Sequence, residues 1–302
     1  MFGLREGEPA TRRGGLTVWR HVGRERGAAA ISLSVLELEP GSSAAWRNGV
    51  CDEVLGILDG EGLVTVAGAS HSLGPGSGVY VRPHGLVQIA STSGKPLAIA
   101  SSRCPDPGPE VFFEDPTVSG GALPSRGARQ RGDSTENGSR SLASLGMTGE
   151  QLGMTGKQLG MTAEQLGMTG EQLVATEAPF PSPVVHFEDQ PTERAGDGRW
   201  FRVLVDAKSG CEPVTQFIGF IPPGRAPEHF HEYEEVVCIL AGTGRFWSGD
   251  ESAPIAAGSC VYLPRRQPHC LENTGSDTLQ LCGLFYPAGS PAVRYRPGGN
   301  GE

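Results

Sequence analysis

The chain repeats itself at a fixed distance of 182 residues. The stretch GSGVY that begins at Gly76 falls on GSCVY at Gly258, and the offset holds without a gap over roughly fifty residues. Other identical pairs at this distance are Glu53 and Glu235, Gly60 and Gly242, Gly62 and Gly244, Leu97 and Leu279, and Pro105 and Pro287. An offset held this long indicates duplication of one structural unit. The 302 residues therefore predict two copies of one fold.

Each copy consists of short apolar or alternating runs separated by turn residues. The first contains AISLSVLEL, EVLGIL and GVYV, and the second contains TQFIGFI, EVVCIL and SCVYL. Forty-five glycines and 24 prolines favour many turns. Regular short strands of this kind are typical of an all-β sandwich or barrel. We place the first unit at residues 14–104 and the second at 180–290.

The segment between the units, residues 105–179, has the composition of a low-complexity linker. It contains four near-identical heptads of the form LGMTGEQ at residues 145–172. A short coiled coil is one interpretation, but Leu and Met lie two residues apart, which is off the spacing that a coiled coil needs. Each Gly also costs a helix about 1 kcal/mol. We expect a disordered or partly helical linker, and a disordered tail at 291–302.

Charge and hydropathy exclude several classes of partner. The net charge of −9 disfavours a nucleic-acid partner, which requires a basic surface. No stretch approaches the roughly 18 apolar residues that cross a bilayer, and the first residues lack the apolar core of a signal peptide. We expect a cytoplasmic protein with no membrane partner. The seven cysteines form no CxxC motif and are expected to be reduced and buried.

The stretch HFHEYEEVVCILAG carries most of the chemistry. His229 and His231 are two apart, so in a strand they point to the same side. Glu235 joins them if the chain bends, and His269 follows the turn after GSCVYLP. Three imidazoles and one carboxylate form a suitable ligand set for a divalent first-row metal. The alternative is a set of surface histidines in a polar loop, which the spacing disfavours.

These two stretches resemble the motifs of the cupin superfamily. GRAPEHFHEYEEVVCILAG is similar to the first cupin motif, and GSCVYLPRRQPHCLEN is similar to the second, which ends at Asn273. Gly224 stands one residue nearer to the histidines than is usual, and Arg266 replaces a common turn glycine. The resemblance implies two double-stranded β-helix barrels of jelly-roll type, that is a bicupin. It also implies that the metal ligands are His229, His231, Glu235 and His269.

The first unit lacks these ligands. Trp46 and Asn48 lie near the positions of the two histidines of the first motif, and Val87 or Gln88 lies at the position of the third histidine. Glu53 alone persists. We therefore expect the first barrel to hold no tight transition metal and to be structural, covering a face of the second barrel as the partner in a cupin homodimer would. A homodimer of the whole chain is also possible.

Neighbouring residues were assigned by strand alternation. The flanking acids Glu232 and Glu234 are expected to be solvated edge charges, because alternation turns them away from the face of Glu235. Gln216, Ile218 and Phe220, on the preceding predicted strand, are candidates either to line the pocket or to pack in the ordinary core, and the same two alternatives hold for Tyr262 and Phe285.

The resemblance implies a small-molecule protein with one divalent transition metal: Fe, Mn, Ni or Zn. Metal-bearing cupins of dioxygenase or isomerase type suggest an enzyme, in which Glu235 would also be the catalytic proton acceptor. The alternative is a non-catalytic binding or storage-type cupin with a structural metal. A fold alone does not decide between these functions.

Overall fold

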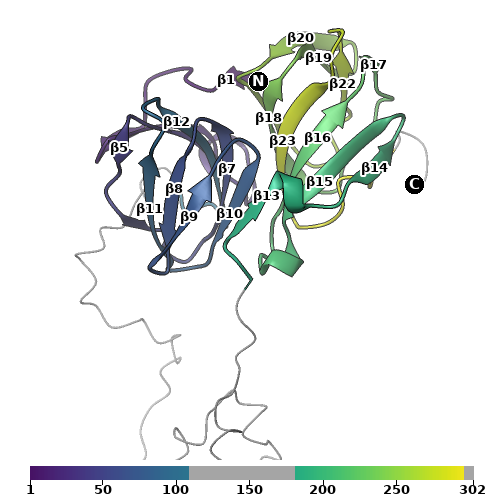
Figure 1. The fold of residues 1–302 in the computed structure, drawn as a ribbon. Coiled ribbons are helices and arrows are strands. Elements are labelled where there is room, and N and C mark those ends of the chain that lie inside the picture. The colour runs from purple at the N-terminus through teal and green to yellow at the C-terminus, as the bar shows by residue number, and fades with distance from the viewer. Residues whose placement is uncertain (109–180, 296–302) are drawn as a thin grey trace, which may run out of the picture. The chain divides into compact units, whose positions relative to one another are not determined.

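The computed structural model describes residues 1–108 and 181–295 (Figure 1). Their strands form two barrels, each with one seven-stranded sheet and one smaller sheet. The prediction of an all-β fold with two double-stranded β-helix barrels is confirmed. The predicted heptads at 145–172 lie outside the described residues. Within the described ranges, no helix is long and apolar enough to span a membrane.

The first barrel, purple to teal in Figure 1, is formed mainly by residues 11–104. Its elements are β2 Thr11–Arg13, β3 Leu16–Val22, the 3-10 helix η1 Arg24–Arg26, β4 Leu33–Leu38, β5 Gly41–Ser42, β6 Trp46–Arg47, β7 Asp52–Asp59, β8 Gly62–Val66, β9 Ala69–Leu73, β10 Ser77–Val81, β11 Leu86–Ser91, β12 Leu97–Cys104 and β13 Val184–His186. The larger sheet has the order β13-β10-β7-β12-β4-β3-β2, and the smaller has the order β5-β11-β8-β9, with β6 also paired to β11.

The second barrel, green to yellow in Figure 1, repeats this plan. Its elements are β1 Phe2–Gly3, the 3-10 helix η5 Phe187–Asp189, β14 Glu193–Gly196, β15 Arg199–Val205, the 3-10 helix η6 Ala207–Ser209, β16 Thr215–Ile221, β17 Gly224–Arg225, β18 Glu234–Ala241, β19 Thr243–Ser248, β20 Glu251–Ala256, β21 Ser259–Leu263, β22 Cys270–Asn273 and β23 Leu279–Tyr286. The larger sheet has the order β1-β21-β18-β23-β16-β15-β14, and the smaller has the order β17-β22-β19-β20.

The strand bounds reproduce the repeat seen in the sequence. Adding 182 to the bounds of β7, β10 and β12 gives the bounds of β18, β21 and β23. These strands also pair in the same way, with β7 and β18 each between the other two. The duplication therefore applies to the central strands of both larger sheets.

The strands of the larger sheets are apolar on both faces because both faces are buried. On β7, Leu55 and Ile57 belong to the core inside the first barrel. Val54, also on β7, belongs instead to a second cluster. This cluster also contains Val236 and Leu284 of the second barrel. This shared cluster holds the two barrels together through the hydrophobic effect.

Short strands are exchanged between the two halves of the chain. Phe2 and Gly3 pair with Cys260 and Ser259 of the second barrel. Residues 184–186 pair with β10 of the first barrel, although they follow the linker region in sequence. The predicted units, which start at residues 14 and 180, do not include this exchange of strands. Edge strands of two or three residues have too little periodicity to be recognised in a sequence.

A slot between two glycines of the first barrel receives a side chain of the second. Gly56 and Gly78 are cross-strand partners. A Cβ atom on either one would lie 2.4 Å from the side-chain amide of Gln216. The absence of side chains at this pair therefore allows the close approach of β16.

The predicted tail at 291–302 needs correction for its first residues. The backbone of Phe230 exchanges two hydrogen bonds with that of Tyr295, at 2.8 and 3.0 Å, and their rings stack. Residues 291–295 thus pack beside the histidine motif because an aromatic pair and a backbone bridge fix them there. The remaining residues, 296–302, lie outside the described ranges.

Candidate metal site

Three histidines converge inside the second barrel. His229 precedes β18 and exchanges backbone hydrogen bonds with His269, at 3.0 and 2.8 Å, just before β22. His231 comes from the same segment as His229. One ring nitrogen of each histidine lies within 4.8 Å of the others, and all three residues are buried. The backbone bridge between the two motifs therefore brings distant histidines together.

Backbone carbonyls fix the orientation of all three rings. The Nδ1 atom of His229 lies 2.9 Å from the carbonyl of Pro227, that of His231 lies 3.0 Å from the carbonyl of Val293, and that of His269 lies 2.9 Å from the carbonyl of Gln267. A carbonyl only accepts, so each Nδ1 carries the hydrogen and donates it. Each neutral ring then has a free lone pair on Nε2, which is the arrangement that metal-binding histidines use.

Burial keeps these rings neutral. It lowers the pKa of His231 to about 3 and that of His269 to about 4, with the neighbouring imidazoles adding to the shift. The pKa of His229 is lowered for the same main reason. Three unprotonated nitrogens therefore face one another at neutral pH. A divalent cation between them would fit this donor set.

Glu235 lies beside the histidines. Its Oε2 atom is 3.7 Å from Nε2 of His231, and its side chain is buried. Burial raises the pKa of Glu235 to about 8. A cation beside this carboxyl group would offset the cost of its ionisation. All four residues predicted as ligands are therefore close together, with the three histidines forming the tighter group.

In the first barrel a protein cation accompanies the corresponding carboxylate. Glu53 is fully buried, and its Oε1 accepts a hydrogen bond from Ser101 Oγ at 2.7 Å and lies 3.2 Å from Nε of Arg103. At the equivalent distance of 182 residues, the second barrel has Gly283 and Phe285. Glu235 therefore has neither of these partners.

Strand pairing shows what replaces the histidines of the first barrel. Trp46 is paired with Val87, as His229 is bridged to His269. The indole nitrogen of Trp46 donates to Oε2 of Glu53 at 3.3 Å. Asn48 uses its side-chain nitrogen to donate to three backbone carbonyls, those of Cys51, Val81 and Arg82. In the first barrel, the hydrogen-bonded side chains of Trp46 and Asn48 thus stand near the positions that the two histidines of the first motif hold in the second barrel.

A small cavity adjoins the histidines. Its volume is about 90 Å³, and it reaches the ring of Tyr233, which stacks on His231 with 4.5 Å between centroids. Its wall is mostly aromatic and aliphatic, and it includes Phe201, Phe217, Gly219, Ile221 and Leu281.

The structure decides between pocket lining and core packing for the three candidates on β16. Of the three candidates, Phe220 lines the cavity, whereas Gln216 and Ile218 do not. Ile218 packs in the cluster between the barrels, and Gln216 lies in the glycine slot of the first barrel. Both faces of β16 are buried, so its apolar pattern gives no indication of which face is interior.

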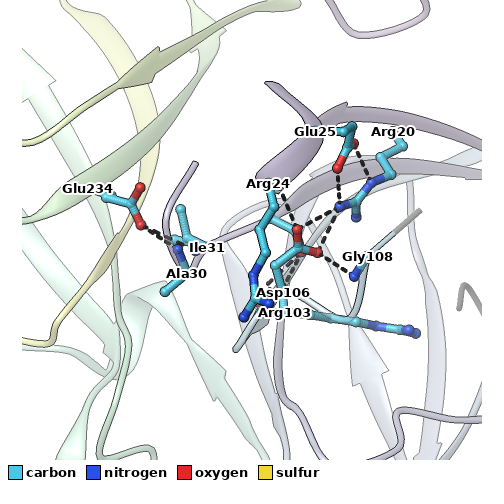
Figure 2. A network of polar contacts seen from close by, with 10 residues as sticks. Arg20, Arg24, Glu25, Ala30, Ile31, Arg103, Asp106, Gly108 and Glu234 are labelled. Carbon is cyan, nitrogen blue, oxygen red and sulfur yellow. Dashed lines mark hydrogen bonds and ion pairs between the residues drawn. The ribbon is translucent and has the colours of Figure 1, made fainter. Parts of the chain in front are cut away.

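The expectation that Glu234 is a solvated edge charge is wrong. Its side-chain oxygens accept hydrogen bonds from the backbone of Ala29 at 2.5 Å, Ala30 at 2.9 Å and Ile31 at 3.3 Å, as Figure 2 shows for two of them. The hydroxyl of Tyr262 donates to it as well, at 2.7 Å. Alternation does turn Glu234 away from the cavity, but that side meets the first barrel and not solvent.

The carboxylate of Asp106 accepts hydrogen bonds from the segment that precedes Ala29. Asp106 is buried and accepts from Nη2 of Arg20 at 2.7 Å, from the backbone of Arg24 at 2.8 Å and from that of Gly108 at 3.1 Å (Figure 2). These bonds hold η1, and the chain continues from η1 to Ala29. The strand that begins with Glu234 and Glu235 is therefore hydrogen-bonded to a segment that Asp106 holds in place.

Two arginines at the cavity had no signal in the sequence. Arg199 begins β15, and Arg294 belongs to the segment after β23; both line the cavity. Neither belongs to the histidine motifs, and their approach depends on the β14–β15 hairpin and on the packing of residues 291–295.

Comparison with protein families identifies part of the chain directly. The model described as "Cupin domain" matches residues 217–285, which include the three histidines and Glu235. Protein SchB of Streptomyces halstedii is 29% identical over 100 residues, 32% of this chain and 72% of that protein. Auxin-binding protein 1 of Arabidopsis thaliana is 31% identical over 71 residues, 20% of this chain and 36% of that protein.

Solved structures extend the likeness to both barrels. A variant of oxalate decarboxylase from Bacillus subtilis has a TM-score of 0.64 at 14% identity, covering 96% of this chain and 78% of that one. A putative glyoxylate induced protein from Pseudomonas aeruginosa has a TM-score of 0.57 at 14% identity, covering 92% and 83%. These likenesses span two barrels in each case. Residues 217–285 therefore match a cupin domain, and the fold of the two barrels is similar to that of these solved structures.

Proposed function

We propose that the second barrel binds one divalent transition metal through His229, His231 and His269, with Glu235 as the fourth ligand, and acts on a small molecule. The observation that carries this proposal is the set of three Nε2 lone pairs. Each Nδ1 is committed to a carbonyl, which leaves the three Nε2 atoms as the acceptors of a cluster whose ring nitrogens lie within 4.8 Å of one another. A cation satisfies all three at once.

The metal would supply Lewis acidity, or redox chemistry if it is iron, manganese or nickel. Four ligands leave two positions open on an octahedral ion and none on a tetrahedral one. The described residues supply the surroundings: the apolar wall excludes water, and Oε2 of Glu235 is placed to take a proton. This combination supports an enzyme of dioxygenase or isomerase type. Manganese is one candidate, since a solved structure of oxalate decarboxylase is titled for its Mn(II) centres.

A second candidate is a binding protein without turnover. It is supported by the similarity to Auxin-binding protein 1, a relative that is named for binding and not for a reaction. In that case the metal or the cavity would hold a small molecule and release it unchanged.

Metal analysis of purified protein tests the common part of both candidates. We expect close to one metal per chain in the wild type and its near-complete loss in His231→Ala. His71→Ala is the matched control, because His71 is a half-buried histidine of β9 in the first barrel. Equal metal content in the wild type and His231→Ala would overturn the assignment of the site.

Glu235→Gln separates enzyme from binder. Glutamine keeps the size and one oxygen ligand but is a far weaker proton acceptor. An enzyme should keep part of its metal and lose conversion in a substrate screen. A wild type that binds a compound tightly and never converts it would replace the enzyme reading with the binding one.

A further inference from the structure

Arg199 lies on the cavity wall. Among the charged residues of this wall that the structure describes, it alone has a buried side-chain nitrogen without a hydrogen-bond partner. Its side chain is 11% exposed, and its Nε is buried without a hydrogen-bond partner within residues 1–108 and 181–295. Leaving such a donor unpaired costs roughly 1–3 kcal/mol, and more for a charged group. The described residues therefore leave part of the hydrogen-bonding capacity of the Arg199 guanidinium unused.

A hairpin turn places a second arginine beside it. Asp197 and Gly198 both have positive φ, 54° and 73°, as expected of a tight two-residue connection between β14 and β15. Oδ2 of Asp197 lies 3.2 Å from Nη2 of Arg199 and 3.3 Å from Nη1 of Arg294. One carboxylate is therefore shared by two guanidinium groups, and a net positive charge remains at the cavity.

The remainder of the wall selects for size and polarity. About 90 Å³ holds on the order of six to nine water-sized groups. Phe201, Phe217, Ile221 and Leu281 offer no hydrogen bonds to a ligand. A fitting molecule thus has a short apolar body, one end toward the histidines and an anionic group toward Arg199.

We infer that the small molecule of the second barrel is a short-chain carboxylate whose carboxylate group is anchored by Arg199. This inference rests on the proposed function and adds the substrate class. The planar fork of arginine matches a carboxylate and pairs with it in two parallel hydrogen bonds. The guanidinium group of Arg199, which lines the cavity, would supply these bonds. Arg199 is therefore a substrate-binding residue, and Asp197 is a positioning residue that orients it.

Calorimetric titration with simple probes tests this assignment. The probes are sodium acetate, propionate and butyrate, with butyramide as the neutral match for butyrate. The proteins are the wild type, Arg199→Gln, Arg199→Lys and the control Arg194→Gln, in which an exposed arginine of β14 is changed. Metal content is measured on every sample before titration.

We expect at least one carboxylate to bind the wild type and Arg194→Gln equally, and butyramide to bind at least tenfold more weakly than butyrate. Arg199→Gln should weaken carboxylate binding at least tenfold at unchanged metal content, and Arg199→Lys should retain part of it because the charge remains.

The inference is overturned if none of the three carboxylates binds the wild type, if butyramide binds as well as butyrate, or if Arg199→Gln binds within twofold of the wild type. A wild type that binds carboxylates through Arg199 but takes up no metal would instead contradict the proposed metal site. The two failures are therefore distinguishable on the same samples.

Discussion

The carboxylate of Glu53 lies 3.2 Å from Nε of Arg103 inside the first barrel. At the equivalent places of the second barrel stand Glu235 and Phe285, which are also cross-strand partners. Each barrel thus has a buried glutamate on a central strand, but the residues around the two glutamates differ. In the first barrel an arginine accompanies the carboxylate, and in the second the carboxyl group lies 3.7 Å from Nε2 of His231.

Replacing Arg103 should therefore destabilise the protein strongly. Arg103→Met leaves Glu53 as a buried carboxylate without its cation, and we expect a loss of about 3–5 kcal/mol in the free energy of unfolding. The measurement is unfolding in urea. The double variant Arg103→Met, Glu53→Gln should recover more than half of the loss, because the uncompensated charge is then gone. An additive double variant would contradict this pairing.

The segment that follows β23 should contribute to metal affinity. Ending the chain after Ser290 removes the carbonyl of Val293, which fixes the ring of His231, and the bridge between Phe230 and Tyr295. Loss of such a supporting group typically costs 10- to 100-fold in metal affinity. Competition with a metal chelator measures the change. A chain ending after Tyr295 is the control and should bind like the full chain; equal affinities in both would rule out this role.

Glu234 and Glu232 should differ sharply in their effect on stability. Glu234→Ala removes the acceptor of three backbone amides, of which that of Ile31 belongs to a buried residue, so we expect a fall of about 1–3 kcal/mol. Glu232→Ala breaks an exposed ion pair with Arg266 and should change stability by less than about 1 kcal/mol. Thermal unfolding of both variants provides the comparison, and similar shifts would contradict the anchoring role of Glu234.

Buried thiols should make the protein less stable in alkali. Burial raises the pKa of Cys104 and of Cys211 from 9.0 to about 12. The folded state then holds two protons that the unfolded state loses between pH 9 and 12. Stability from this source is complete below pH 9 and falls as pH rises through that window. The decline from pH 8 to 10, followed by urea unfolding, should be smaller in the double variant Cys104→Ala, Cys211→Ala; an identical decline would contradict this origin.

The histidine cluster could be predicted from the sequence because its members lie at fixed places in two motifs. His229 and His231 are two residues apart, and the turn before His269 is recognisable. Val87 and Trp46 could be placed at the missing ligand positions by the repeat. Arg199 could not be found, since its place at the cavity depends on how a hairpin folds over the barrel and on no local pattern.

Alternation predicted orientations but not environments. Glu234 points away from Glu235, as period two requires, yet the far side of β18 meets the first barrel. For Gln216 the sequence left pocket lining and core packing open, because TQFIGFI is apolar on both faces, and both faces are buried. For strands covered on both faces, knowing which residues share a face does not tell which face is interior.

The exchange of β1 and β13 makes each half of the chain dependent on the other for a finished sheet. A cut between the two barrels would leave β21 without Phe2 and Gly3, and β10 without residues 184–186. Each half would then present an unpaired row of amide and carbonyl groups, which invites association with other chains. The duplicated units are thus no longer separable modules, even though each has its own interior core.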